Sequence, residues 1–502
     1  MNSQQTEFQT ACEKGDIDVV RILLDDSRVN PAYNKNEAIQ LACERGHVDV
    51  VRVLMADKRV NPAKDNNLAI QLACRYGHVD VVRLLMTDRR VKPAADKNHA
   101  ICLACGNGHV DVVRFLVGSG RINPANSNNN AIRWACANGR INVVCLLLDD
   151  SRVNPADEEN EAIRLVCEYG HVDVVRLLLA DPRVNPADKN NAAIILACAN
   201  GHLGLVRLLL ADVRINPADC ENGAIQRACF KGHLDVVRLL LVDPRVNPAD
   251  NSNYAIRQAC ESGHVDVVRL LLTDSRVNPA DMNNNAIRWA CWRGHLDVLF
   301  VLLADRRVNP ADCDNEAIRL ACQYGHLDVV RLLLADSRVN PADKNNEAIR
   351  LACCYGHVDV VRLLLADSRV NPADYDNEAI RLACRKRHIE VVSLLLTDPR
   401  IDMCHIISAW RYTLSSALLA LGFGPSLNKW GLLDPSVYNL DVLRYWQTTS
   451  YINLYNQDEE LWNGPYGILL KHRLKVADLY GCAALTSRLP VEMIEVVLEH
   501  IK

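Results

Sequence analysis

The chain has 502 residues, of which 49% are hydrophobic and 24% charged, a composition typical of a folded chain. Aromatic residues make up only 5%, so we expect a core built from Val, Leu, Ile, Ala and Cys. With 57 basic and 61 acidic side chains the net charge is −4, which excludes the broad positive field that non-specific nucleic-acid binding requires. The longest apolar run, near Leu414–Phe423, is shorter than the roughly 20 residues that span a bilayer. The first residues carry no apolar signal-peptide segment. We therefore expect no membrane insertion, and a cytoplasmic or nuclear location.

Residues 6–400 contain one motif repeated thirteen times. A cysteine recurs every 31 residues from Cys12 to Cys384, without insertion or deletion. An asparagine (Asn36 to Asn377) and a proline (Pro31 to Pro372) recur twelve times each in the same register, and an arginine (Arg28 to Arg400) recurs thirteen times. Strict self-similarity at such a period is typical of repeat architectures. The sequence therefore predicts a tandem array rather than a set of unrelated domains.

The repeat that begins at Asn315 predicts a short first helix. We interpret Asn315 as the N-cap, because a short polar side chain can bond to the free amides of the first turn. Ile318, Ala321 and Cys322 then fall on one apolar face. Gly325 can end this helix with a positive φ angle.

A second helix is predicted over residues 326–334, followed by a turn over 336–343. Asp328 lies in the first turn of this helix, where a negative charge suits the helix dipole. Its predicted buried stripe consists of Leu327, Val330, Leu333 and Leu334. Pro341 prevents the helix from continuing. One such unit buries too little apolar surface to be stable alone, so the units must stack into an all-α helix-pair solenoid.

At this point the chain resembles the ankyrin-repeat family. The segment at 325–335 is similar to the second helix of that family, and residues 338–343 stand where the family has its β-hairpin. Two features differ: Glu316-Ala317-Ile318-Arg319 replaces the family's Thr-Pro-Leu-His opening, and the period is 31 rather than 33. The resemblance therefore implies an ankyrin-type solenoid with short hairpin-like turns.

The two end repeats depart from the pattern in ways expected of caps. In the first repeat Glu7 replaces alanine and Thr10 replaces leucine, which makes its outer side more polar. In the last repeat Arg387 replaces the glycine.

No catalytic or cofactor site is predicted. Histidine follows the repeated cysteine by four residues in most repeats, as in Cys322 and His326, and both residue types bind zinc. However, one pair supplies only two ligands, and adjacent helices are about 8–10 Å apart. We therefore expect buried thiols that pack as small hydrophobic groups. No nucleotide-binding or metalloprotease motif occurs, so we predict a non-enzymatic protein without a metal or cofactor.

The candidate partner-binding residues lie where the repeat varies. By the resemblance, two kinds of position face the concave groove: a slot usually held by leucine, and the two residues before the glycine. Aromatic and arginine side chains are typical anchors of protein interfaces. The predicted partner-binding residues are Trp134, Arg227, Gln258 and Trp289 in the first kind of position, and Phe230, Trp292, Tyr324 and Tyr355 in the second.

Residues 401–502 lack the repeat and are rich in aromatic residues, which predicts a small, mostly helical module. Its end, 488–502, resembles the opening helix of an F-box, with a Leu-Pro-x-Glu start. Ankyrin proteins of large DNA viruses carry shortened segments of this kind, which dock on a Skp-type adaptor of a cullin ubiquitin ligase. The resemblance implies adaptor contacts by Leu489, Pro490, Glu492, Met493, Val497 and Ile501. A helix that packs on its own module has the same pattern.

Two functions follow from the sequence. The first is a non-enzymatic scaffold that binds a partner protein in the groove of the solenoid. The alternative adds recruitment of a cullin-type ubiquitin ligase through the F-box-like end, which makes the chain a substrate receptor.

Overall fold

The computed structural model describes residues 3–401, which form 26 helices and no strand. The prediction of an all-α helix-pair architecture is therefore confirmed for this part of the chain. The chain divides into two compact units, an N-terminal unit (Met1–Asp281) and a C-terminal unit (Met282–Lys502). The predicted module at 401–502 and its F-box-like end at 488–502 lie outside the described residues.

The described helices of the N-terminal unit are α1 Ser3–Lys14, α2 Ile17–Leu24, α3 Tyr33–Arg45, α4 Val48–Ala56, α5 Lys64–Tyr76, α6 Val79–Leu85, α7 Ala95–Asn107, α8 Val110–Gly118, α9 Asn126–Ala137, α10 Ile141–Leu148, α11 Asp157–Tyr169, α12 Val172–Ala180, α13 Asp188–Ala199, α14 Leu203–Leu210, α15 Asp219–Lys231, α16 Leu234–Val242, α17 Asp250–Ser262 and α18 Val265–Leu272. Those of the C-terminal unit are α19 Asp281–Arg293, α20 Leu296–Leu303, α21 Asp312–Tyr324, α22 Leu327–Leu334, α23 Asp343–Tyr355, α24 Val358–Leu365, α25 Asp374–Lys386 and α26 Ile389–Leu395.

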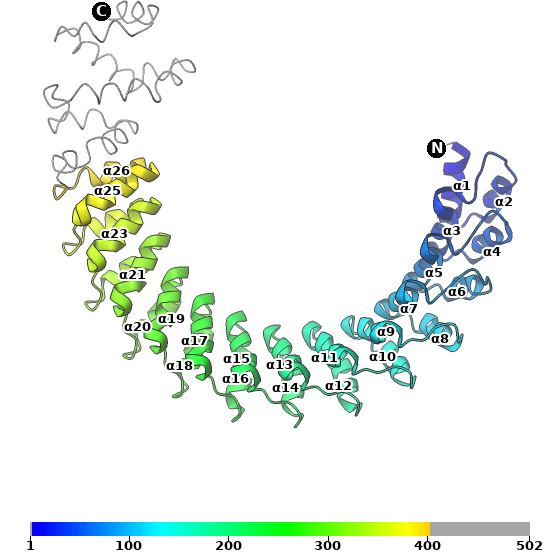
Figure 1. Cartoon of the computed structure of the whole chain (residues 1–502), viewed down its shortest axis with the longest axis horizontal. Coiled ribbons are helices and arrows are strands. Elements are labelled where there is room, and N and C mark those ends of the chain that lie inside the picture. Colours follow the sequence, from blue (N-terminus) through cyan, green and yellow to red (C-terminus); the bar gives the residue numbers. More distant parts are fainter. Residues whose placement is uncertain (1–2, 402–502) are drawn as a thin grey trace, which may run out of the picture. The chain divides into compact units, whose positions relative to one another are not determined.

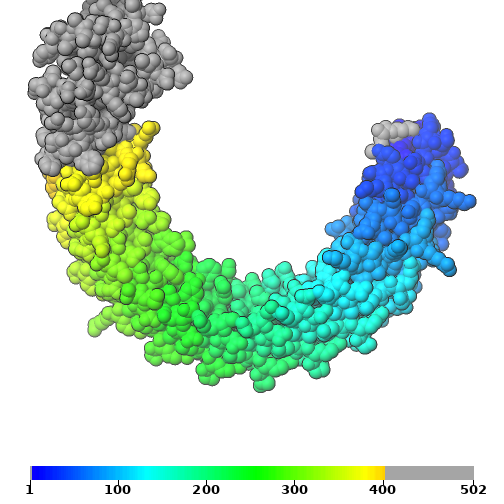
Figure 2. All heavy atoms as spheres, viewed as in Figure 1, coloured from blue at the N-terminus to red at the C-terminus, as the bar shows by residue number. Residues whose placement is uncertain are grey.

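Within each unit the helices form two layers. Odd-numbered helices pack against their odd-numbered neighbours, and each even-numbered helix packs on the odd-numbered helix that precedes it (Figure 1). In the N-terminal unit the layer of odd-numbered helices lies on the concave side (Figure 1). Figure 2 shows that successive repeats of this unit pack against one another without gaps. The odd-numbered helices therefore carry the side chains that face the hollow of this unit.

The core of one repeat follows the predicted apolar pattern with one correction. In α21 the predicted face of Ile318, Ala321 and Cys322 is buried, and Gly325 ends the helix at φ +77°, as predicted. In α22 the buried side chains are Val329, Val330 and Leu333. The predicted stripe was wrong for Leu327 and Leu334, which are partly exposed. Both residues are the ends of α22, and its contacts with α21 and with the neighbouring helices α20 and α24 bury only the residues between them.

The prediction that Asn315 is an N-cap was wrong. Residues 313–315 have left-handed backbone angles, and no side chain caps the start of α21. The Asn315 side chain instead bonds to the next repeat: its Oδ1 accepts the Asn340 amide proton at 2.7 Å, and its Nδ2 donates to Asp343 at 2.5 Å. The same pair of bonds recurs in the N-terminal unit, where Asn222 bonds to the Asn247 amide and to Asp250. The repeated asparagine is thus a buried link between adjacent repeats. We call such a recurring side-chain contact between adjacent repeats a rung.

The repeated arginine forms a second rung. Arg245 holds the Asp243 carboxylate with two N–H groups, at 2.9 and 2.6 Å, and its third nitrogen donates to the Ile215 carbonyl of the preceding repeat at 2.9 Å. The side-chain hydrogen bond from Arg245 lowers the pKa of Asp243. Arg338 makes the same contacts with Asp336 and Val308 in the C-terminal unit.

The repeated histidine forms a third rung. In the C-terminal unit the Nε2–H of His326 donates to the Trp292 carbonyl at 2.9 Å, at the end of the preceding odd-numbered helix. The ring also lies against the glycine of that preceding repeat, because a Cβ placed on Gly294 would be 2.5 Å from its Nδ1. Gly294 has φ +80°, so both the backbone angle and the close approach of the ring require glycine.

The first and the last described repeats each replace one of the recurring residues. Gln5 replaces the asparagine, and its Oε1 accepts the Asn30 amide proton at 2.9 Å, so the longer side chain keeps the rung. Glu7 and Thr10 are exposed, in agreement with the predicted polar cap. In the last repeat Arg387 occupies the glycine position at φ +63°.

Candidate functional site

The odd-numbered helices of the C-terminal unit present aromatic side chains at their C-terminal ends. Trp292 of α19 and Tyr324 of α21 are in edge contact, with ring centroids 6.2 Å apart. Tyr324 and Tyr355 are 47% and 52% exposed. Trp289 lies one helical turn before Trp292 and is partly exposed. We call Trp292, Tyr324 and Tyr355 the aromatic strip.

The two tyrosines of the strip lie against the histidine rungs. Tyr324 stacks on His326 and Tyr355 stacks on His357, each with centroids 6.5 Å apart and the same interplanar angle of 17°. Each of these histidines is bonded to the preceding odd-numbered helix. Each tyrosine ring therefore packs on a side chain that joins two repeats.

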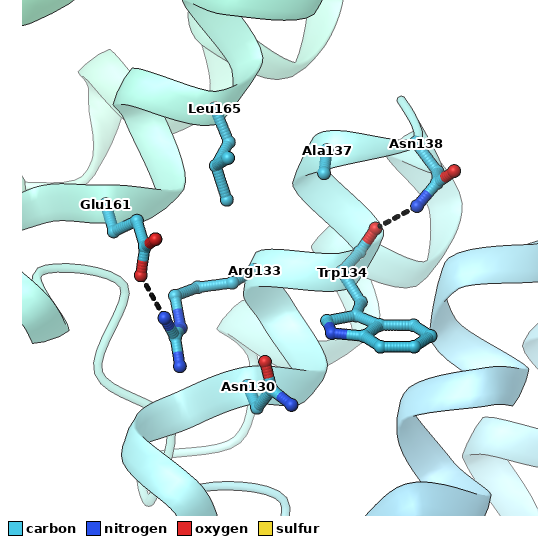
Figure 3. Close-up of a pocket in the computed structure, with 7 residues that line it drawn as sticks. All are labelled: Asn130, Arg133, Trp134, Ala137, Asn138, Glu161 and Leu165. Carbon is cyan, nitrogen blue, oxygen red and sulfur yellow. Dashed lines mark hydrogen bonds and ion pairs between the residues drawn. The ribbon is translucent and has the colours of Figure 1, made fainter.

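In the N-terminal unit, Trp134 lines an open pocket of about 340 Å³ between α9 and α11 (Figure 3). The indole packs edge-on against His99, with centroids 5.8 Å apart. It lies over Gly106 of α7, where a Cβ would be 3.0 Å from the ring, so the absence of a side chain at Gly106 makes room for it. On the opposite side of the pocket Arg133 forms an ion pair with Glu161.

The remaining predicted residues of the N-terminal unit differ in accessibility. Arg227 is exposed, and Phe230 is partly exposed with the Lys231 ammonium 5.4 Å from its ring centroid. Gln258 is buried, 7% exposed, and donates to Glu261 at 3.1 Å. Burial therefore removes Gln258 from the surface that we predicted it to share with the other residues.

Sequence reasoning missed one group of exposed residues. Arg385 and Lys386 end α25, with Lys386 at the position that Tyr355 occupies in α23, and Arg387 follows at the glycine position; all three are exposed. Within residues 3–401 none of the three forms an ion pair. The signal was present in the sequence as three consecutive basic residues, but we read this position only for the loss of the repeated glycine.

The repeated cysteines are buried, as predicted, and all cysteines in the described part of the chain are free thiols. Burial raises the pKa of the Cys12 and Cys167 thiols to about 12, which keeps these thiols protonated at neutral pH. Among residues 3–401 no group of three His, Cys, Asp or Glu side chains is placed to hold a metal ion.

The comparison with known proteins agrees with this architecture. A family model described as ankyrin repeats (3 copies) matches residues 8–98, 87–158, 150–219, 225–317 and 318–405, which is most of the chain. The chain belongs to the ankyrin-repeat family. Ankyrin repeats act as protein-interaction scaffolds and are typically non-enzymatic. No curated protein gives a significant match to the sequence. In the part of the chain that the structure describes, no helix combines the length and the apolar character needed to cross a bilayer.

Proposed function

We propose that this ankyrin-repeat protein binds a partner protein through the odd-numbered helices of its C-terminal unit. The observation that supports this proposal is the aromatic strip. Its tyrosines are about half exposed and stack on histidines that are bonded to the preceding odd-numbered helix. Tyrosine and tryptophan are the side chains most often found to anchor interfaces, because they bury a large area at low entropic cost.

Site-specific photo-crosslinking tests this proposal in the full chain. A photoreactive phenylalanine analogue would replace Tyr355 in one variant and Phe300 in a matched control. Phe300 is 54% exposed but lies in the even-numbered layer, on α20. We expect a discrete crosslinked product from position 355 in cells that express the protein, and none from position 300. Equal crosslinking at both positions would contradict the proposal.

In the N-terminal unit, Trp134, Arg227 and Phe230 are proposed as additional contacts with a protein partner. The pocket beside Trp134 supports this role for Trp134, because the indole lines an open cavity together with Leu165 and with polar side chains such as Arg133 and Glu161 (Figure 3). Crosslinking from position 134 would test it in the same experiment.

We further propose recruitment of a Skp-type adaptor by residues 489–501. This proposal is supported by the Leu489-Pro490-x-Glu492 start and by the apolar face of Met493, Val497 and Ile501. Calorimetry of the full chain with such an adaptor, and of a Leu489→Ala/Pro490→Ala variant, tests it. Binding that the double substitution abolishes would support a ligase receptor, and absence of binding by the unaltered chain would contradict it.

We also propose a reducing compartment, the cytoplasm or the nucleus. Three exposed free cysteines, Cys145, Cys220 and Cys313, support this assignment, since exposed thiols persist where glutathione keeps them reduced. Microscopy of the tagged full chain tests it.

A further inference from the structure

The surface next to the aromatic strip carries a one-sided charge. In the C-terminal unit the two positions before the glycine are occupied by Trp292-Arg293, Gln323-Tyr324, Cys354-Tyr355 and Arg385-Lys386. None of these residues is acidic. Arg387 adds a further cation at the glycine position.

The equivalent positions of the N-terminal unit are balanced. They hold four glutamates (Glu13, Glu44, Glu168, Glu261) and four cations (Lys14, Arg45, Arg75, Lys231). Arg45 forms an ion pair with Glu13 of the preceding repeat at 2.7 Å. The guanidinium of Arg75 and the ammonium of Lys231 lie over the adjacent rings of Tyr76 and Phe230. The same helix ends are therefore neutral in one unit and cationic in the other.

We propose that the aromatic strip and the basic end of α25 together bind an extended acidic peptide segment of a partner protein. This inference rests on the proposed function and adds the chemistry of the partner. Apolar side chains of the segment pack on Tyr324 and Tyr355, and carboxylates at one end of it meet Arg385 and Lys386. Both cations are exposed, and within residues 3–401 neither forms an ion pair.

The spacing of the repeats sets the length of the segment. Trp292 and Lys386 stand on helices separated by three repeat spacings of about 8–10 Å each. An extended chain advances about 3.3 Å per residue, so about nine residues cover this distance. About three residues of the segment cover one repeat spacing, so every third side chain of the segment can contact a successive repeat.

The distribution of charge favours a peptide over a nucleic acid. The cations are concentrated at α25, whereas the repeats of α21 and α23 contribute tyrosines and no cation at these positions. A nucleic acid has a charge at every nucleotide and gains most from a continuous basic track. A peptide can place its carboxylates at one end and its apolar side chains along the rest.

Fluorescence anisotropy with the full chain tests the proposal. The probe is a labelled peptide of about nine residues, with three glutamates at one end followed by leucines and a phenylalanine. The comparison probes are the same peptide with lysines in place of glutamates, and an oligouridylate of about equal length. We expect binding of the acidic probe alone, weakened about fivefold or more between about 0.05 and 0.3 M salt.

The decisive variant is Arg385→Glu/Lys386→Glu, with Lys14→Glu as its matched control. Lys14 stands at the position of Lys386 in the first repeat and is also exposed. Arg387 is left unchanged because its backbone is left-handed. The double charge reversal is expected to weaken acidic-probe binding about tenfold or more. Lys14→Glu is expected to leave the affinity unchanged, and neither variant should alter the thermal melting curve.

Several results would overturn the proposal: equal binding of the lysine probe, preferred binding of the oligouridylate, or no effect of the double reversal in a folded variant. Binding that appears only after Asp458, Glu459 and Glu460 are replaced by their amides would also overturn it, because the chain's own acidic run would then be the occupant. If crosslinking from position 355 persists in the double-reversal variant, the proposed function stands and the acidic partner does not.

Discussion

The N-terminal and C-terminal units share the contacts that join their repeats, but they differ in the residues at the exposed ends of their odd-numbered helices. The asparagine, arginine and histidine rungs described above have equivalent partners in both units. The exposed helix ends share no such uniformity, since they are charge-balanced in the N-terminal unit and aromatic and basic in the C-terminal unit. The contacts that join the repeats therefore lie at positions that recur, and the proposed partner contacts lie at positions that vary.

The sharpest way to break this comparison is to remove one buried rung. Asn222→Leu deletes the bonds to the Asn247 amide and the Asp250 carboxylate; the Asn247 amide loses its partner, and Asp250 keeps only the bond from the Asn247 side chain. We expect a loss of about 2–4 kcal/mol in the free energy of unfolding, measured by urea denaturation. The exposed Asn200, replaced by alanine, is the control and should change stability by less than about 0.5 kcal/mol. Similar losses in both variants would show that the rung is not special.

Substitutions at the glycine position are expected to have opposite signs in the interior and in the last described repeat. Gly232→Ala places a Cβ at φ +79°, 2.5 Å from the Nδ1 of His264, and should cost about 1–3 kcal/mol. Arg387→Gly relieves the left-handed angle of a non-glycine residue and should stabilise by about 1 kcal/mol. Thermal melting of both variants checks this prediction, and a destabilised Arg387→Gly would contradict it.

A smaller effect is expected from the arginine rungs at low pH. The pKa of Asp336 is lowered in the folded chain, because Arg338 bonds to its carboxylate. The unfolded chain then binds more protons, so this stabilisation is present above the unfolded pKa of about 3.9 and is lost as the pH falls through the folded value. Asp336→Asn should reduce the acid-induced loss by about 0.5–1 kcal/mol, after allowance for the exposure of Arg338. Urea titrations at about pH 6 and pH 3 measure it, and an unchanged difference between the two pH values would argue against it.

The smallest effect on the free energy of unfolding is expected from a substitution in the aromatic strip. Tyr355→Ala removes a half-exposed ring that stacks on His357 and should change the free energy of unfolding by less than about 0.5 kcal/mol. Calorimetric melting measures this change. A loss comparable to that of Asn222→Leu would mean that the tyrosine is part of the scaffold.

How much of this was predictable depends on the residue. The cysteine register and the glycine turns follow from local rules, since a small apolar face and a positive φ angle are properties of a single repeat. The role of Asn315 does not, because its two partners belong to the next repeat and an N-cap asparagine looks identical in sequence. A usable signal was the first repeat, where Gln5 keeps the rung with a longer side chain.

The candidate surface was predictable in residue type and less so in position. Tyr324 and Tyr355 are exposed as expected, but Gln258 is buried and its amide bonds to Glu261 one turn later on the same helix. The direction of a polar side chain depends on the residues that it contacts in space. A comparison of the repeats position by position does not include these contacts. The basic end of α25 stands out as a candidate site only by comparison with the uncharged ends of α21 and α23.

The rungs also determine how the length of this chain can change. Each rung joins residues 25, 28, 30 or 34 positions apart, so none reaches beyond the adjacent repeat. Deleting or duplicating any 31 consecutive residues inside a unit restores every one of these spacings. Unequal recombination within the gene therefore yields shorter or longer chains that fold by unchanged bonds. Such events create new neighbours among the exposed side chains, so binding surfaces can be reshuffled in evolution without cost to the fold.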